Sequence, residues 1–210
     1  ATHAGISVGE DGATHQCNED IALMRTIPGM TIINPADDVE AKQAVKAAAK
    51  LDGPVYLRFG RLAAPVFNDE KTYKFELGKG ITLKDGSDIT IIATGLMVSE
   101  ALEAAKQLES DGISARVVNI HTIKPIDKEL ICKCAKETGV LVTVEEHSII
   151  GGLGSAVADT VTECCPVPVV KIGVNDEFGY SGPAVELLKK FGLCAENIIA
   201  KTKEAVKLKK

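Results

Sequence analysis

The sequence predicts an α/β protein made of three-layer sandwiches with mainly parallel sheets, in which an incomplete α/β domain precedes a complete one. Short runs of apolar and β-branched residues alternate with amphipathic segments of roughly ten residues, the pattern of parallel strands joined by right-handed helical crossovers. The two segments of the chain differ in length and in the number of predicted strands. The first segment, of about 60 residues, is too small and too poor in strands to stand alone, whereas the second, of about 125 residues, has the usual size of a domain.

Residues 1–68 are assigned to the incomplete domain. The β-branched run at 31–33 and the run at 55–58 predict strands. A short helix is expected at 20–25, since Pro28-Gly29 would stop it, and a second helix begins at Asp37 or Asp38, either of which can cap it. Residues 69–87 are interpreted as a linker that runs into a hairpin, because Gly78-Lys79-Gly80 separates two strand-like runs.

Residues 88–210 are predicted to form the complete domain. The Gly151-Gly152-Leu153-Gly154 run is expected to open one of its helices as a close-packed loop; it lacks the glycine spacing of a dinucleotide site. The remaining boundaries follow from apolar runs and helical periodicity. Strands are expected at 89–93, 115–119, 140–144 and 167–172, and helices at 98–109, 127–136, 151–162, 183–191 and 195–208.

Composition narrows the class of protein. A net charge of −5 with both signs interspersed gives no support for nucleic-acid binding, which requires a basic face. No apolar run approaches the roughly 18–20 residues that cross a bilayer, and no signal segment is visible, so a cytoplasmic protein without a membrane partner is expected. The cysteines lack zinc-site spacing and are predicted to be free thiols in a reducing compartment. They are Cys17, Cys132, Cys134, Cys164, Cys165 and Cys194.

The first fifteen residues carry the strongest functional signal. His3 and His15 bracket a loop that contains three glycines and the acidic pair Glu10 and Asp11. Loops of this composition often recognise polar small molecules, and two imidazoles facing a cleft suggest proton transfer or anion binding. From the residues alone, the loop could bind a sugar hydroxyl, a phosphate or a metal ion, although no tight histidine spacing supports the metal. The alternative is a glycine-rich turn with incidental histidines.

Charged residues also follow two predicted strands. Arg58 ends the strand predicted at 55–58 and Arg61 follows it; ligands gather at the carboxyl ends of parallel strands, where a guanidinium can clamp a phosphate. A surface cation is an equally good interpretation of either arginine. Glu145-Glu146-His147 ends the strand at 140–144 and could serve a site, an interface or a structural ion pair.

The motifs together resemble those of transketolase. The family's active-site loop is similar to the opening run, in particular to Gly9-Glu10-Asp11-Gly12-Ala13-Thr14-His15. The likeness spans almost the whole chain and implies the latter half of a pyrimidine-binding domain followed by a C-terminal domain. It continues at Ile33-Asn34-Pro35-Ala36-Asp37, Gly53-Pro54-Val55-Tyr56-Leu57-Arg58, Ile91-Ile92-Ala93-Thr94-Gly95, Ala115-Arg116-Val117-Val118-Asn119, Val144-Glu145-Glu146-His147 and Gly151-Gly152.

This resemblance implies an enzyme that uses thiamine diphosphate and a divalent metal (Mg or Ca) to transfer a two-carbon ketol unit between ketose and aldose phosphates. It implies that His3 contacts the sugar or its phosphate, and that Asp11 binds the hydroxyl next to the donor carbonyl. His15 would bind the same region and assist proton transfer, so Asp11 and His15 are the expected catalytic residues. Arg61, with Arg58 as a near alternative, would bind the phosphate.

The resemblance is incomplete in a way that implies partners. The chain has no counterpart of the glutamate that protonates the cofactor's aminopyrimidine, nor of the motif that holds the diphosphate through a metal. A missing N-terminal part or subunit is therefore expected, in a homodimer or heterotetramer, with the chain alone inactive. The alternatives are a piece of deoxyxylulose-phosphate synthase, which Glu10 and Arg61-Leu62-Ala63 disfavour, and a non-catalytic dimerisation or regulatory module.

Overall fold

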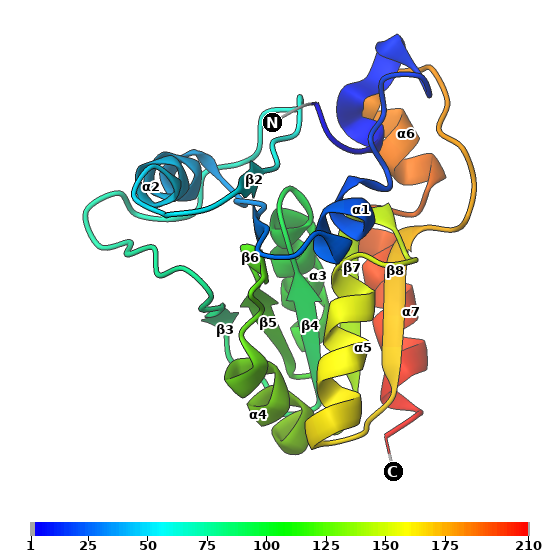
Figure 1. Cartoon of the computed structure of the whole chain (residues 1–210). Coiled ribbons are helices and arrows are strands. Elements are labelled where there is room, and N and C mark those ends of the chain that lie inside the picture. The colour runs from blue at the N-terminus through cyan, green and yellow to red at the C-terminus, as the bar shows by residue number, and fades with distance from the viewer. Residues whose placement is uncertain (1–2, 210) are drawn as a thin grey trace.

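The computed structural model describes residues 3–209, so Ala1 and Thr2 at the start of the opening run, and Lys210, lie outside the described residues. Two sheets flanked by helices confirm the predicted mixed α/β class (Figure 1). Within residues 3–209, no helix combines the length and the apolar character that spanning a membrane requires.

The larger sheet has five strands in the order β3-β5-β4-β7-β8. β4, β5, β7 and β8 run parallel, and only the edge strand β3 is antiparallel, paired with β5. β4 and β5 coincide with their predicted ranges, because each is a short apolar run bounded by polar turn residues, whereas β7 ends four residues later than predicted and β8 begins and ends two residues later. The strands are β3 (Ile81–Lys84), β4 (Ile89–Ala93), β5 (Ala115–Asn119), β7 (Leu141–Ser148) and β8 (Val169–Val174).

Helices cover both faces of this sheet. α3 (Met97–Ser110) and α7 (Ala195–Val206) share one apolar core with Ile91 of β4, whereas α4 (Lys128–Thr138) and α5 (Leu153–Cys164) share another with Ile92. Adjacent residues of one strand therefore serve opposite cores, as the alternation of side chains along a strand requires. The predicted three-layer arrangement is confirmed for this domain.

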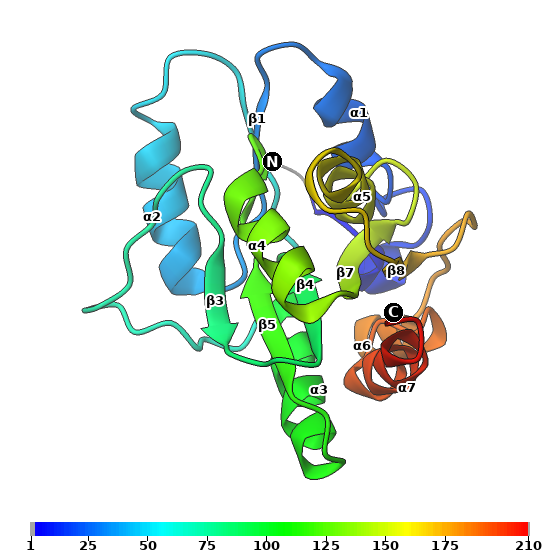
Figure 2. The same ribbon diagram turned by 90° about the horizontal axis from the view of Figure 1, so that it is seen from below.

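The smaller sheet has the order β2-β1-β6. β1 (Thr31–Ile33) and β2 (Val55–Leu57) are parallel, and α1 (Asp20–Thr26) and α2 (Asp38–Ala48) lie to either side of them (Figure 2). The third strand, β6 (Thr122–Lys124), comes from the second domain and pairs antiparallel with β1. β6 was not predicted, since a three-residue strand before Pro125 has no periodicity that the sequence could reveal. The incomplete sheet is thus extended by its neighbour.

The predicted hairpin within residues 69–87 is wrong. Only β3 forms there, and its partner is β5 rather than a preceding strand. A boundary at residue 88 would also remove β3 from the sheet to which it belongs. The segment before it crosses α2 instead, where the Tyr73 hydroxyl donates to Glu40. Gly80 marks the close approach to β5, because a Cβ there would lie 2.5 Å from Ile120 Cδ1.

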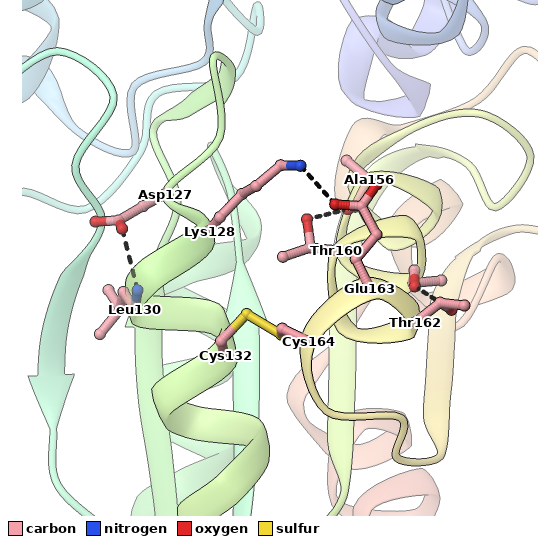
Figure 3. The surroundings of a disulfide bond; sticks show 10 residues. Asp127, Lys128, Leu130, Cys132, Ala156, Thr160, Thr162, Glu163 and Cys164 are labelled. Carbon is pink, nitrogen blue, oxygen red and sulfur yellow. Dashed lines mark hydrogen bonds and ion pairs between the residues drawn. A yellow bond between two sulfur atoms is a disulfide. The ribbon is translucent and has the colours of Figure 1, made fainter.

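The cysteines are not all free, as the sequence analysis expected. Cys132 of α4 and Cys164 of α5 form a disulfide across the two helices, beside the ion pair of Lys128 and Glu163 (Figure 3). The other four cysteines are free thiols. Spacing along the chain could not reveal this pair, because the two residues are 32 positions apart and meet only when α4 and α5 pack on the same face.

Reducing this disulfide should lower the free energy of unfolding by about 3 kcal/mol, because a cross-link over this separation limits the unfolded chain. The Cys132→Ser variant should show the same loss in urea denaturation and should no longer respond to reductant. Cys165→Ser is the matched control and should keep the response. An unchanged midpoint in the Cys132→Ser variant would contradict a stabilising cross-link.

Candidate functional site

The opening segment is anchored where the first domain meets the second. His3 bridges to Phe59 in parallel register, and the Ala4 and Gly5 amides donate to Phe59 O (3.1 Å) and Cys17 O (2.9 Å). It continues as a short 3-10 helix, η1 (Ile6–Asp11), which packs against α6 (Ala184–Lys190), as Figure 1 shows. The predicted glycine-rich loop therefore contains a short 3-10 helix.

Asp11 and Arg61 form an ion pair at the end of η1. Both side chains stay accessible, with 41% of Asp11 and 44% of Arg61 exposed, and Arg61 Nη1 also donates to Val8 O at 3.2 Å. The structure thus brings together two residues that the sequence analysis placed at opposite ends of a ligand. A guanidinium and a carboxylate in water exchange partners readily, since exposed pairs contribute little free energy.

The two histidines are exposed, and they lie on either side of Asp11 along the chain. His3 pairs with Phe59 in an isolated parallel bridge, and Phe59 lies two residues before Arg61 in the sequence. The His15 ring Nδ1 lies 3.0 Å from Thr14 Oγ1. Across residues 3–209, no group of three histidine, cysteine or acidic side chains could hold a metal ion.

Arg58 is not an accessible cation. Only 3% of it is exposed, and its guanidinium donates to Asp20 Oδ2 (2.8 Å) and Oδ1 (3.2 Å), to Glu146 O (2.9 Å) and to Cys17 O (3.2 Å). Burial raises the pKa of Asp20, but the Arg58 guanidinium outweighs it and lowers that pKa below its usual value. Arg58 as a phosphate ligand therefore stays a prediction, while the burial of its side chain and the bonds of Nε and Nη2 to Asp20, Glu146 and Cys17 favour a structural role.

The Glu145-Glu146-His147 run is structural and buried. Glu145 accepts from the amides of Leu153 (2.6 Å) and Gly154 (2.8 Å) at the start of α5, which confirms the close-packed loop predicted there. Glu146 accepts from Ser7 N at 2.5 Å. Burial, aided by the Arg58 charge, lowers the pKa of His147 to about 4, so its ring is neutral near pH 7.

Glu145 should make stability depend on pH. Burial raises the pKa of its carboxyl to about 7, above the usual 4.5, despite the two amides that lower it. The native state therefore holds this proton to higher pH than the unfolded chain, and Glu145 lowers the free energy of unfolding as pH rises from about 5 to about 7. We expect the free energy of unfolding of Glu145→Gln, relative to that of the wild type, to rise by on the order of 2 kcal/mol between pH 5 and pH 8, as measured by urea denaturation. A constant difference would contradict this.

Comparison with known proteins identifies the family. The transketolase C-terminal domain model matches residues 78–198, and the transketolase pyrimidine binding domain model matches residues 1–66. The chain belongs to the transketolase family. The predicted order, a pyrimidine-binding segment followed by a C-terminal domain, is confirmed.

Among curated relatives of this transketolase-family chain, a putative transketolase C-terminal section from Methanocaldococcus jannaschii is 50% identical over 99% of the chain and 65% of its own length. A 6-deoxy-6-sulfo-D-fructose transketolase subunit from Clostridium sp. is 45% identical over 98% of the chain and 63% of its own. A 1-deoxy-D-xylulose-5-phosphate synthase from Heliobacterium modesticaldum is 41% identical, over 97% and 32%. The chain therefore spans less than two thirds of the length of the transketolase relatives.

Solved structures agree. A structure described as a split gene transketolase, inactive beta4 tetramer, matches with a TM-score of 0.93 and 51% identity, over all of this chain and 67% of the other. A transketolase from Pichia stipitis in complex with fructose 6-phosphate matches with a TM-score of 0.79 and 29% identity, over 99% of this chain and 29% of the other. The transketolase fold therefore extends across the described residues.

Proposed function

We propose that this chain is the sugar-phosphate-recognising part of a thiamine-diphosphate-dependent transketolase, which transfers a two-carbon ketol unit between ketose and aldose phosphates. The observation that supports it is the accessible ion pair of Arg61 with Asp11, which lies in the segment bracketed by His3 and His15. A ketose phosphate needs a cation at one end and hydroxyl-binding groups with a proton carrier at the other. Exposed Arg61 offers the cation, and the exposed residues of the opening segment offer the other groups.

In this proposal the substrate separates the ion pair. Arg61 turns to the phosphate, which it can bind through two parallel hydrogen bonds. Asp11 then accepts a hydrogen bond from the hydroxyl next to the donor carbonyl, and His15 binds the same region and carries a proton. His3 contacts the sugar or its phosphate. Because the pair is exposed, its separation requires little free energy.

Most of the binding site for the cofactor is assigned to another part of the assembly. Thiamine diphosphate supplies the carbanion chemistry when bound, and its metal, Mg or Ca, needs carboxylate and carbonyl oxygens. Within residues 3–209, no three histidine, cysteine, aspartate or glutamate side chains are grouped so that they could hold this metal. We therefore place this site on the polypeptide that carries the diphosphate-binding domain.

The proposal implies an assembly, as a homodimer of a longer protein or as a heterotetramer of two kinds of subunit, with this chain inactive alone. A related split-gene transketolase subunit described as an inactive tetramer supports that view. The cytoplasmic location remains a prediction, and the disulfide of Cys132 and Cys164 weighs against a strongly reducing compartment.

The test is reconstitution with the polypeptide that carries the diphosphate-binding domain, in the presence of the cofactor and Mg²⁺. Xylulose 5-phosphate with ribose 5-phosphate should give sedoheptulose 7-phosphate. The second candidate, supported by the 41% identity to a deoxyxylulose-phosphate synthase, predicts turnover of pyruvate with glyceraldehyde 3-phosphate instead. That outcome without ketol transfer would overturn the proposal, and no turnover of either pair would favour a regulatory module.

A further inference from the structure

Glu146 belongs to the C-terminal domain, yet its side chain contacts the opening segment of the other domain. It lies on β7, is 4% exposed, and its Oε1 accepts from Ser7 N at 2.5 Å. The preceding residue on the same strand, Glu145, binds the start of α5 instead. Since neighbouring residues of a strand point to opposite sides, the two buried carboxylates serve different partners.

Glu146 lies so close to the backbone of the opening segment that position 5 must be glycine. Gly5 has a φ of 82°, and a Cβ on it would lie 2.3 Å from Glu146 Oε1. The carboxylate thus occupies the space that a side chain at position 5 would need. It also gives a partner to an amide in the first turn of η1, which has no acceptor within that helix.

Other bonds hold Glu146 itself in place. Arg58 donates to Glu146 O at 2.9 Å, and the same nitrogen reaches Cys17 O at 3.2 Å. Cys17 O also accepts from Gly5 N. The Arg58 guanidinium therefore links β7, through Glu146 O, to the backbone at Cys17 and Gly5. The carboxylate from β7 thus bonds Ser7, which lies two residues before the kink of η1 at Gly9 and four residues before Asp11.

We propose that Glu146 is a positioning residue that couples the C-terminal domain to sugar-phosphate recognition: its carboxylate holds η1 so that Asp11 stands beside Arg61. The ordering of η1 by Glu146 is independent of which reaction the enzyme performs, whereas its consequence for the substrate rests on the proposed function.

Hydrogen exchange of the full chain tests the ordering directly. Glu146→Met keeps the volume but removes the acceptor, so amide exchange across residues 5–11 should rise by about 10-fold or more. Glu146→Gln keeps a carbonyl acceptor and should exchange like the wild type. Glu145→Met is the matched control and should instead raise exchange at residues 153–156. Wild-type exchange at residues 5–11 in folded Glu146→Met would overturn the proposal.

A second variant covers the case in which Glu146→Met does not fold. Gly5→Ala should displace the carboxylate and raise exchange across residues 6–11, whereas Gly29→Ala, with a φ of 73° and open space around its Cβ, controls for backbone strain alone. Equal exchange in the two alanine variants would count against Glu146.

Kinetics of the reconstituted assembly test the coupling. The KM for the ketose phosphate should rise about 10-fold in Glu146→Met and recover in Glu146→Gln, with a smaller change in kcat, because a misplaced η1 weakens binding first. A fall in kcat alone, not rescued by glutamine, would overturn the coupling. Raised exchange at residues 5–11 in an assembly without ketol transfer would reject the proposed function and leave the ordering of η1 by Glu146 intact.

Discussion

Replacing Asp11 by asparagine should lower kcat/KM for ketol transfer by about 100-fold in the reconstituted assembly, while the fold stays intact. The carboxylate is the proposed acceptor for the donor hydroxyl, and hydrogen bonds to charged groups are the strong ones. Asparagine has nearly the same shape but loses the charge. Since the Asp11 side chain is 41% exposed, its loss should change the free energy of unfolding by less than about 1 kcal/mol.

Asp85→Asn is the matched control for Asp11, because Asp85 is exposed in the turn after β3, outside the opening segment. It should retain full activity in the same assay of sedoheptulose 7-phosphate formation. Equal activity of the two variants would show that the opening segment does not bind the substrate through Asp11, and the regulatory-module interpretation would then be favoured.

Replacing Arg58 by methionine should destabilise the chain by about 3–5 kcal/mol, the usual effect of leaving one member of a buried ion pair alone. The change would strand the Asp20 carboxylate and remove donors from Glu146 O and Cys17 O. Methionine fills much of the volume of arginine, so the loss reports the polar contacts rather than a cavity. Urea denaturation of the full chain measures it.

Arg61→Met is the comparison for Arg58, because both arginines follow β2 and both were candidate phosphate ligands. The pair of Arg61 with Asp11 is exposed, so its loss should change the free energy of unfolding by less than about 1 kcal/mol. A similar loss of stability in the two variants would contradict the separation of a structural arginine from a functional one.

Elements whose signal is local were predictable from the sequence. β1, β4 and β5 coincide with their predicted ranges, since each is an apolar, β-branched run ended by a polar residue or a turn. Asp37 is the cap of α2, as one of the two predicted candidates, and its side chain accepts from Glu40 N. Three of the candidate residues, His3, Asp11 and His15, were visible because the opening motif is contiguous.

Features that depend on distant partners were not predictable. β6 is a strand because it pairs with β1, which is distant in the sequence. The disulfide of Cys132 and Cys164 forms because α4 and α5 pack on the same face of the sheet. The sequence could not show that Arg58 is buried and Arg61 exposed, because both follow the same strand. The ion-pair partner of Arg58 is Asp20, which lies 38 residues earlier. Glu146 carried a signal, an acidic pair at a strand end, but its partner Ser7 is 139 residues away.

The measurement that tests the central claim most directly is kcat/KM of the Arg61→Met assembly with a ketose phosphate and with the same ketose lacking the phosphate. The account predicts a fall of about 100-fold with the phosphorylated donor and little change with the other, because the guanidinium binds only the phosphate. An equal fall with both donors, or no fall with either, would contradict the assignment of the Asp11 and Arg61 pair to sugar-phosphate recognition.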